Sequence, residues 1–166
     1  KHMNDYFIIL GGGKGRRFGQ KKPKQYFKYK DKILFHHSID KALDSKLFKK
    51  IVVVASYKYK KEFNKYNKNK LIFIEGGNQR KDSSIKALKQ IKKFKPKNVF
   101  IHDAARPNFS IKLISNLVKQ LKKNIAVVPT IKSRDSIKYK NQKNYINFEK
   151  KKIYLTQTPQ AFRYKN

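Results

Sequence analysis

A glycine-rich stretch near the start of the chain is the first candidate for chemistry. Gly11-Gly12-Gly13-Lys14-Gly15-Arg16-Arg17 follows a short apolar run, and Lys24 comes soon after it. Glycines let a backbone approach a ligand closely and aim N–H groups at phosphate oxygens, while Arg17 and Lys24 add positive charge. No Gly-Lys pair precedes Ser or Thr, and the third glycine of a dinucleotide fingerprint is missing. The stretch predicts phosphate binding without ATPase or dehydrogenase chemistry; a plain flexible turn is the alternative.

A second glycine-containing loop holds Gly76, Gly77 and Arg80 and leads into a helical pattern. Asp82 or Ser83 is expected to cap that helix. A helix N-terminus with a spare hydroxyl also suits a nucleotide base or phosphate. The cap and the nucleotide contact remain open as alternatives for this loop.

The third stretch is His102-Asp103-Ala104-Ala105-Arg106-Pro107, which follows another apolar run. Mg²⁺ is commonly held by one or two carboxylates together with substrate phosphates, and with 10 Asp and Glu in the chain Asp103 is the best candidate ligand. His102 is expected to orient or pack rather than act as a base. Arginine is scarce beside lysine, so Arg80 and Arg106 in these loops indicate bidentate phosphate recognition.

The elements that must position these loops alternate along the chain. Apolar runs predict buried strands, and apolar residues at helical spacing predict three helices between them. This order predicts an α/β fold: a Rossmann-like open, mostly parallel sheet with helices on both faces, and a ligand site beyond the carboxyl ends of its strands. The expected strands are 6–10, 51–55, 71–74, 99–101 and 125–128, and the helical sets run from Leu34 to Leu47, from Ile85 to Ile91 and from Ile111 to Leu121.

After Pro129 the pattern changes to a hairpin-like excursion, a β-arm near 136–156 with polar and apolar residues interspersed. Such an arm is too small to bury its own apolar face. Packing against another subunit, as a dimerisation arm over 135–157, and folding back as a lid on its own domain are the two alternatives.

Composition bounds the remaining possibilities. The 166 residues suit a single domain over 1–166, and 43 Lys and Arg against 10 Asp and Glu give a net charge of +33. Lysines are spread along the chain rather than clustered, which disfavours a specific nucleic-acid surface, although a non-catalytic basic nucleic-acid-binding domain is the alternative from another functional class. The chain has no cysteine, which is compatible with a cytoplasmic protein, and no apolar run long enough to cross a membrane.

Taken together, these motifs resemble one family of enzymes. Gly13-Lys-Gly-Arg-Arg17, Pro23-Lys-Gln-Tyr26, Gly76-Gly77 with Arg80 and Ser83, His102-Asp-Ala-Ala-Arg-Pro107 and Gln157-Thr-Pro-Gln160 match, in order and spacing, the cytidylyltransferases that make CDP-methylerythritol in the non-mevalonate isoprenoid pathway. The resemblance implies transfer of a cytidylyl group from CTP to 2-C-methyl-D-erythritol 4-phosphate with release of pyrophosphate. Ribitol 5-phosphate, another polyol phosphate, is the alternative acceptor.

The resemblance also implies roles for individual residues. Arg17 and Lys24 would carry catalysis, Asp103 would hold Mg²⁺, and the arm would join a homodimer and help build the partner's site. The CTP-binding set would be Gly12, Gly13, Lys14, Gly15, Arg16, Arg17, Lys24, Gly76, Gly77, Arg80 and Ser83. The acceptor-binding set would be Arg106, Asp135, Ser136, Lys150 and Thr158.

Three features depart from the family pattern. Gly11-Gly12 stands where the family has two alanines, Asp135-Ser136 stands for Asp-Thr, and Lys150 replaces an arginine of the arm. Lysine cannot bind phosphate through two parallel hydrogen bonds as arginine does. The family's chain also continues beyond Gln157-Thr-Pro-Gln160 with a further segment, so this sequence is expected to lack the family's C-terminal part, and some relatives carry a second, cyclodiphosphate synthase domain.

Overall fold

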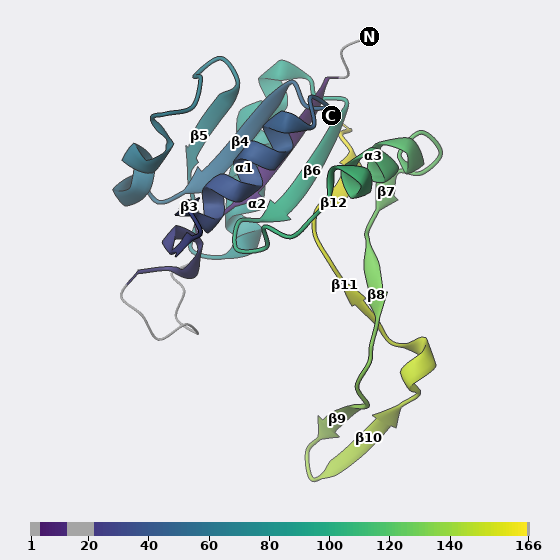
Figure 1. Cartoon of the computed structure of the whole chain (residues 1–166). Helices are drawn as coiled ribbons and strands as arrows, with labels where there is room; N and C mark the ends of the chain where they lie inside the picture. Colours follow the sequence, from purple (N-terminus) through teal and green to yellow (C-terminus); the bar gives the residue numbers. More distant parts are fainter. Residues whose placement is uncertain (1–3, 13–21, 166) are drawn as a thin grey trace.

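The computed structural model describes residues 4–12 and 22–165, and a six-stranded sheet forms its centre (Figure 1). The strand order is β5-β4-β1-β6-β12-β7. The strands are β1 (Asp5–Leu10), β4 (Lys50–Ala55), β5 (Leu71–Glu75), β6 (Asn98–Asp103), β7 (Ala126–Val127) and β12 (Gln160–Arg163). Four of them, β5, β4, β1 and β6, run parallel, and β12 is antiparallel to both of its neighbours.

Strand β1 lies in the middle of the parallel part, and all six of its residues are buried. Its Leu10 pairs with Val54 of β4 on one side and with Asp103 of β6 on the other. Parallel strands buried on both faces need continuous apolar sequence, which is what the run from Tyr6 to Leu10 supplies. The pairing places the carboxyl ends of β1, β4 and β6 level at one edge of the sheet.

Helices cover both faces of the sheet, as the sequence predicts. Helix α1 (Leu34–Asp44) and helix α3 (Ile111–Gln120) pack on the face that carries Phe7 and Ile9. Helix α2 (Arg80–Ile91) packs on the opposite face. Successive residues of a strand point to opposite faces, so one strand contributes side chains to both hydrophobic cores.

The sequence prediction succeeds for the parallel strands and fails at the far edge. Residues 125–128 were expected to form a buried strand, but β7 has two residues and Ile125 is 66% exposed. Strand β12, which pairs between β6 and β7, was not expected at all. Helix α1 ends at Asp44, so Leu47 lies beyond it, and Ile85 is on the exposed side of α2.

Short elements connect the larger ones. They are the 3-10 turns η2 (Lys24–Tyr26), η3 (Tyr57–Phe63) and η4 (Lys92–Phe94), and the two-residue strands β2 (Lys28–Tyr29) and β3 (Lys32–Ile33). The side chain of Ser56 caps η3 by accepting the Lys58 N–H. Among the described residues, no helix has the length and apolar character needed to span a membrane.

The predicted arm is present and begins earlier than 136. Two antiparallel pairs, β8 with β11 and β9 with β10, carry the chain away from the sheet and back (Figure 1). The elements of the arm are β8 (Thr130–Lys132), β9 (Ile137–Asn141), β10 (Asn144–Phe148), the 3-10 turn η5 (Lys150–Lys152) and β11 (Tyr154–Thr156).

The end of β1 is packed so closely that Gly11 has no room for a side chain. A methyl group at this position would overlap the ring of Phe35 in α1, with ring atom Cζ at 2.8 Å, and that ring is fully buried. We therefore expect Gly11→Ala to lower the free energy of unfolding by about 1–3 kcal/mol, the usual cost of overpacking a core. Denaturation in urea, followed by circular dichroism, measures the change.

The matched test is the double variant Gly11→Ala/Phe35→Leu. Because leucine lacks the outer ring atoms that the new methyl group would meet, the double variant should be less destabilised than the sum of the two single variants. Simple additivity would contradict the contact.

Candidate active site

The first part of the site is the end of β1 and the turn that carries Lys24. The Gln25 side chain is buried and donates a 2.6 Å hydrogen bond from Nε2 to the Gly11 carbonyl. The Gly11 N–H in turn donates to the Val54 carbonyl at 2.7 Å. These bonds hold the base of η2 against the end of β1, and the adjacent Lys24 is exposed.

The second part is the loop after β5, which meets the end of β1. A methyl group on Gly76 would lie 3.1 Å from Gly12 Cα, and one on Gly12 would lie 3.2 Å from Ser83 Oγ. The Gly77 N–H donates to Ser83 Oγ at 3.0 Å. Gly12, Gly76, Gly77 and Ser83, all predicted to bind the nucleotide, therefore converge, and the absence of side chains allows the two backbones to approach.

The cap of α2 differs from the expectation of Asp82 or Ser83. Gln79 is the N-cap, and its side chain accepts the backbone N–H of Asp82 while the Asp82 carboxylate accepts the Gln79 N–H. This reciprocal pair is a capping box in which Gln and Asp replace the commoner Ser and Glu. Ser83 lies one residue further into the helix, where its hydroxyl bonds to the loop.

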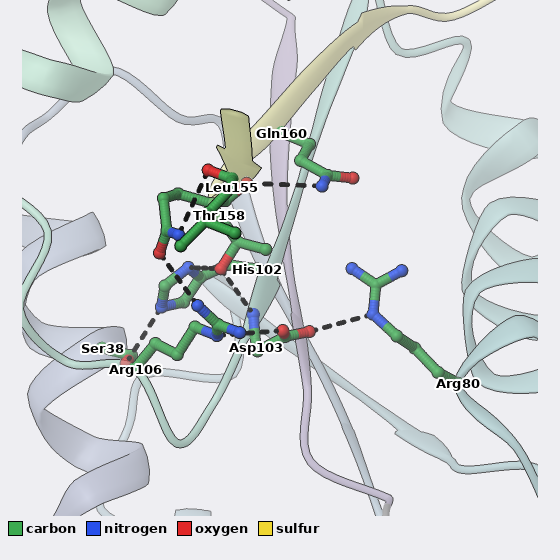
Figure 2. Close-up of polar contacts among 9 residues, drawn as sticks. Ser38, Arg80, His102, Asp103, Arg106, Leu155, Thr158 and Gln160 are labelled. Atoms are coloured by element: carbon green, nitrogen blue, oxygen red, sulfur yellow. Dashed lines mark hydrogen bonds and ion pairs between the residues drawn. The ribbon is translucent and has the colours of Figure 1, made fainter. Parts of the chain in front are cut away.

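The third part is Asp103, whose carboxylate lies between two guanidinium groups. Figure 2 shows Arg80 and Arg106 approaching it from opposite sides, with Nε–Oδ distances of 3.0 and 3.4 Å. Arg106 also donates from Nη1 to Gln157 Oε1 at 3.0 Å. The side chains of both arginines are 51% exposed, so the ion pairs are worth at most about 1 kcal/mol each and exchange readily.

The fourth part joins β6 to the loop before β12. The Asp103 N–H donates to Thr158 Oγ1 at 3.3 Å, and the same oxygen lies 2.9 Å from His102 Nδ1 (Figure 2). His102 is completely buried, and this burial lowers its pKa from 6.5 to about 4. A neutral ring without contact to solvent is not placed to be a general base, which agrees with the predicted orienting role.

Several predicted residues are not part of this cluster. Gly13, Lys14, Gly15, Arg16 and Arg17 lie outside the described residues. Asp135 and Ser136, between β8 and β9, and Lys150, in η5, are exposed on the arm, which extends away from the sheet edge (Figure 1). Within a single chain, these arm residues therefore lie away from Asp103.

Three contributors were not singled out from the sequence. Gln25 holds the Lys24 turn, Gln157 holds Arg106, and Ser38 of α1 lies 3.5 Å from His102 Nε2. The two glutamines stand within motifs that were noted for other residues. Ser38 could have been noticed as a polar residue on the apolar side of an amphipathic helix, where a buried hydroxyl needs a partner.

The carboxylates available for a metal are few. The part of the chain that the structure describes contains no group of three or more His, Cys, Asp or Glu side chains arranged to hold a metal ion. Asp103 is a lone carboxylate, and the flanking pairs with Arg80 and Arg106 must loosen before it can ligate. This donor set fits Mg²⁺ when substrate phosphates supply further ligands, and it does not make a protein-only metal site.

Comparison with known proteins agrees with this geometry. The family model described as IspD, 2-C-methyl-D-erythritol 4-phosphate cytidylyltransferase, matches residues 6–166. The chain belongs to this family. Family members use CTP, and the family match favours methylerythritol phosphate over ribitol phosphate as the acceptor.

Individual relatives support the assignment. The 2-C-methyl-D-erythritol 4-phosphate cytidylyltransferase of Thermotoga neapolitana is 33% identical over 159 residues, which are 95% of this chain and 72% of the relative. The bifunctional enzyme IspD/IspF of Pelagibacter ubique is 49% identical over 163 residues, 98% of this chain and 44% of the relative. The crystal structure of the Francisella tularensis cytidylyltransferase superposes with a TM-score of 0.79 at 30% identity, covering 96% of this chain and 72% of that one. The chain thus spans less than half of the bifunctional relative.

The buried histidine of the cytidylyltransferase fold gives a pH-dependent stability. Between pH 6.5 and about 4 the unfolded chain protonates His102 while the folded chain does not, so the free energy of unfolding falls as pH falls. The loss across this window should approach about 3 kcal/mol. Burial also lowers the pKa of His36, which adds to the same trend. Urea denaturation at a series of pH values measures it.

Variants separate the two histidines. His102→Asn should remove the contribution of His102 to the slope between pH 6.5 and 4, and His36→Asn should remove only the contribution of His36. Parallel pH curves for wild type and His102→Asn would contradict the assignment.

Proposed function

We propose that the protein containing this chain transfers the cytidylyl group of CTP to 2-C-methyl-D-erythritol 4-phosphate, forming CDP-methylerythritol and pyrophosphate. The observation that carries the proposal is the convergence of the β1, β5 and β6 loops at one sheet edge, where Gly12, Ser83 and Asp103 lie. Family membership supplies the identity of the two substrates.

The reaction needs positioning and charge stabilisation more than proton transfer. A phosphate oxygen of the acceptor attacks the α-phosphorus of CTP, and the bond from that phosphorus to the leaving pyrophosphate breaks in line. The nucleophile is already an oxyanion, so no base is required, in keeping with the buried, neutral His102. Cations near the site would stabilise the added negative charge.

On the nucleotide side, the backbone of Gly12, Gly76 and Gly77 allows a close approach, and the N-terminus of α2 favours negative charge. Lys24, held beside the end of β1 by Gln25, would reach the phosphates. By the resemblance, residues 13–17, with Arg17 as the catalytic member, would complete the triphosphate loop.

Asp103 would hold Mg²⁺ together with the phosphates of CTP. The ion supplies charge neutralisation on the triphosphate when it is bound. Arg80 and Arg106 can exchange Asp103 for phosphate oxygens at small cost because their ion pairs are half-exposed. The same exchange would leave the carboxylate available to the metal.

On the acceptor side, Arg106 and Thr158 lie beside Asp103, whereas Asp135, Ser136 and Lys150 lie on the arm. A second copy of the chain would supply the arm residues to this site. Lys150 would contact the acceptor phosphate as a point charge, where an arginine would bind it with two parallel hydrogen bonds.

The arm supports a homodimer because its apolar side chains are exposed. In the register of β9 and β10, Tyr139 faces Ile146 and Ile137 faces Phe148, which puts these four residues on one side of the hairpin. Tyr139, Ile146 and Phe148 are 55%, 46% and 45% exposed. A two-stranded ribbon with an uncovered apolar face is marginal alone, and a second copy would cover it.

The catalytic role of Lys24 leads to a direct test. Full-length protein with CTP, methylerythritol phosphate and Mg²⁺ should release pyrophosphate, and ribitol 5-phosphate should support much slower release. Lys24→Met should lower kcat/KM by about 100-fold or more, the usual effect of losing one group that stabilises transition-state charge.

The matched control is Lys28→Met, which changes an exposed lysine on β2 and should keep wild-type activity. Wild-type protein that releases no pyrophosphate with either acceptor would defeat the proposed function. Equal activity of Lys24→Met and Lys28→Met would defeat the role of Lys24.

The proposed dimer has its own test. Ile146→Lys places a charge on the apolar side of the hairpin and should weaken self-association by at least about tenfold, measured by analytical ultracentrifugation. Lys140→Gln, on the opposite side of the same hairpin, is the control and should leave association unchanged. A wild-type protein that is monomeric at micromolar concentration would overturn the proposal.

A further inference from the structure

Lys41 joins helix α1 to the loop that carries Arg106. Its Nζ donates a hydrogen bond to the Pro107 carbonyl at 2.7 Å and lies 5.1 Å from the centre of the Phe109 ring. The Phe109 ring is buried, and the Lys41 side chain is half-buried. Burial lowers the pKa of the Lys41 ammonium, because the charged form is partly withdrawn from water. Lys41 therefore differs from a lysine that only extends into solvent.

The loop between β6 and α3 depends on contacts with its neighbours for its shape. Residues 106–110 have irregular backbone, and the Arg106 N–H donates to the Asp103 carbonyl at 3.0 Å. Pro107 has no N–H, so its carbonyl is the backbone group through which it can be tied to another element. Lys41 supplies that tie, one residue after Arg106.

One side of α1 contacts both halves of the candidate site. Phe35, Ser38 and Lys41 follow one another at intervals of three residues, which places them along the same side of the helix. The Phe35 ring fills the space beside Gly11 at the end of β1, and Ser38 Oγ lies 3.5 Å from Nε2 of the buried His102. Lys41 reaches the loop after β6. The helix thus links the nucleotide side of the site to the acceptor side.

We propose that Lys41 is a positioning residue that fixes the Arg106 loop against α1, in a set place relative to the end of β1. Lys41 acts through this loop and not by contact with a substrate. In-line attack requires the acceptor phosphate and the α-phosphorus of CTP in one geometry, and a small displacement of either lowers the rate. Because Arg106 would bind the acceptor, loss of the Lys41 bond should weaken acceptor use and spare CTP binding. This inference rests on the proposed cytidylyltransferase function of the site.

Steady-state kinetics of the full-length protein separate the two substrates. Lys41→Met keeps most of the side-chain length and removes the donor. It should lower kcat/KM for the acceptor about tenfold, the effect of losing one hydrogen bond from a charged group, and leave KM for CTP unchanged. Lys41→Arg can still donate and should restore most of the activity. Wild-type kinetics in Lys41→Met would overturn the proposal.

The matched control is Lys112→Met, which removes an exposed lysine in the first turn of α3, just beyond the same loop. It should behave like wild type with both substrates. A loss equal to that of Lys41→Met would show that any positive charge near the loop suffices, and would overturn the role of the Pro107 bond.

Action through Arg106 is tested by a double variant. In an Arg106→Met background, Lys41→Met should cause no further loss, because the loop no longer carries the group that it positions. If the Lys41 charge instead attracted the substrates directly, the two losses would add, and the loss in Lys41→Met would shrink as ionic strength rises. Additive losses would overturn the proposal.

Hydrogen exchange measures the loop without any substrate. In mass spectrometry of the peptide that covers residues 103–110, backbone amides should exchange about tenfold faster in Lys41→Met than in wild type, while those of β1 keep their rates. Equal exchange of the loop in both proteins would overturn the proposal. So would faster exchange throughout the chain with KM raised for both substrates, which is the result of a general structural defect. Wild-type protein without transferase activity refutes the proposed function separately, since exchange does not depend on turnover.

Discussion

The parallel pairing of β1 with β4 and β6 is the constraint on which the site depends. Leu10 pairs with both Val54 and Asp103, so the chain leaves β1 next to the residue at which β6 ends. The Ala104 N–H donates to the Leu10 carbonyl at 3.0 Å and extends this pairing into the loop. A shift of one residue in β1 would turn its apolar residues to the wrong faces of both cores, so the register is strongly determined. The packing of β1 into the two hydrophobic cores therefore fixes where the candidate site lies.

The parallel strands were predictable because each is an apolar run buried on both faces, a pattern that needs no knowledge of its partners. The far edge of the sheet was not predictable in the same way. Strand β12 has four residues, only Ala161 of them buried, and β7 has two residues beside the exposed Ile125. Such short antiparallel strands are set by pairing with β6, which is a tertiary contact.

The residues of the candidate site also fall into those that the sequence predicted and those that only the structure showed. The motifs pointed to Asp103, Arg80 and Ser83 as candidates, because loops at the ends of parallel strands meet at one edge. Gln25 and Ser38 came only from the structure, since they act through contacts with Gly11 and His102 across the fold. Gly11, at a position where the family resemblance leads us to expect alanine, illustrates this dependence on distant contacts. The Phe35 ring occupies the space that a methyl group at position 11 would need, so glycine there follows from a neighbour distant in sequence.

The net positive charge of the chain attracts anionic ligands over a long distance, whereas the site recognises them by short-range contacts. At the sheet edge the carboxylate of Asp103 faces Arg80 and Arg106, while the excess of 33 positive charges is spread over the sequence. A field of this kind raises the local concentration of polyanions and speeds their encounter, without choosing among them. Choice among polyanions requires groups that recognise something other than charge. Thr158 places one neutral hydroxyl at this edge, because its oxygen accepts the Asp103 N–H and lies 2.9 Å from Nδ1 of the buried His102.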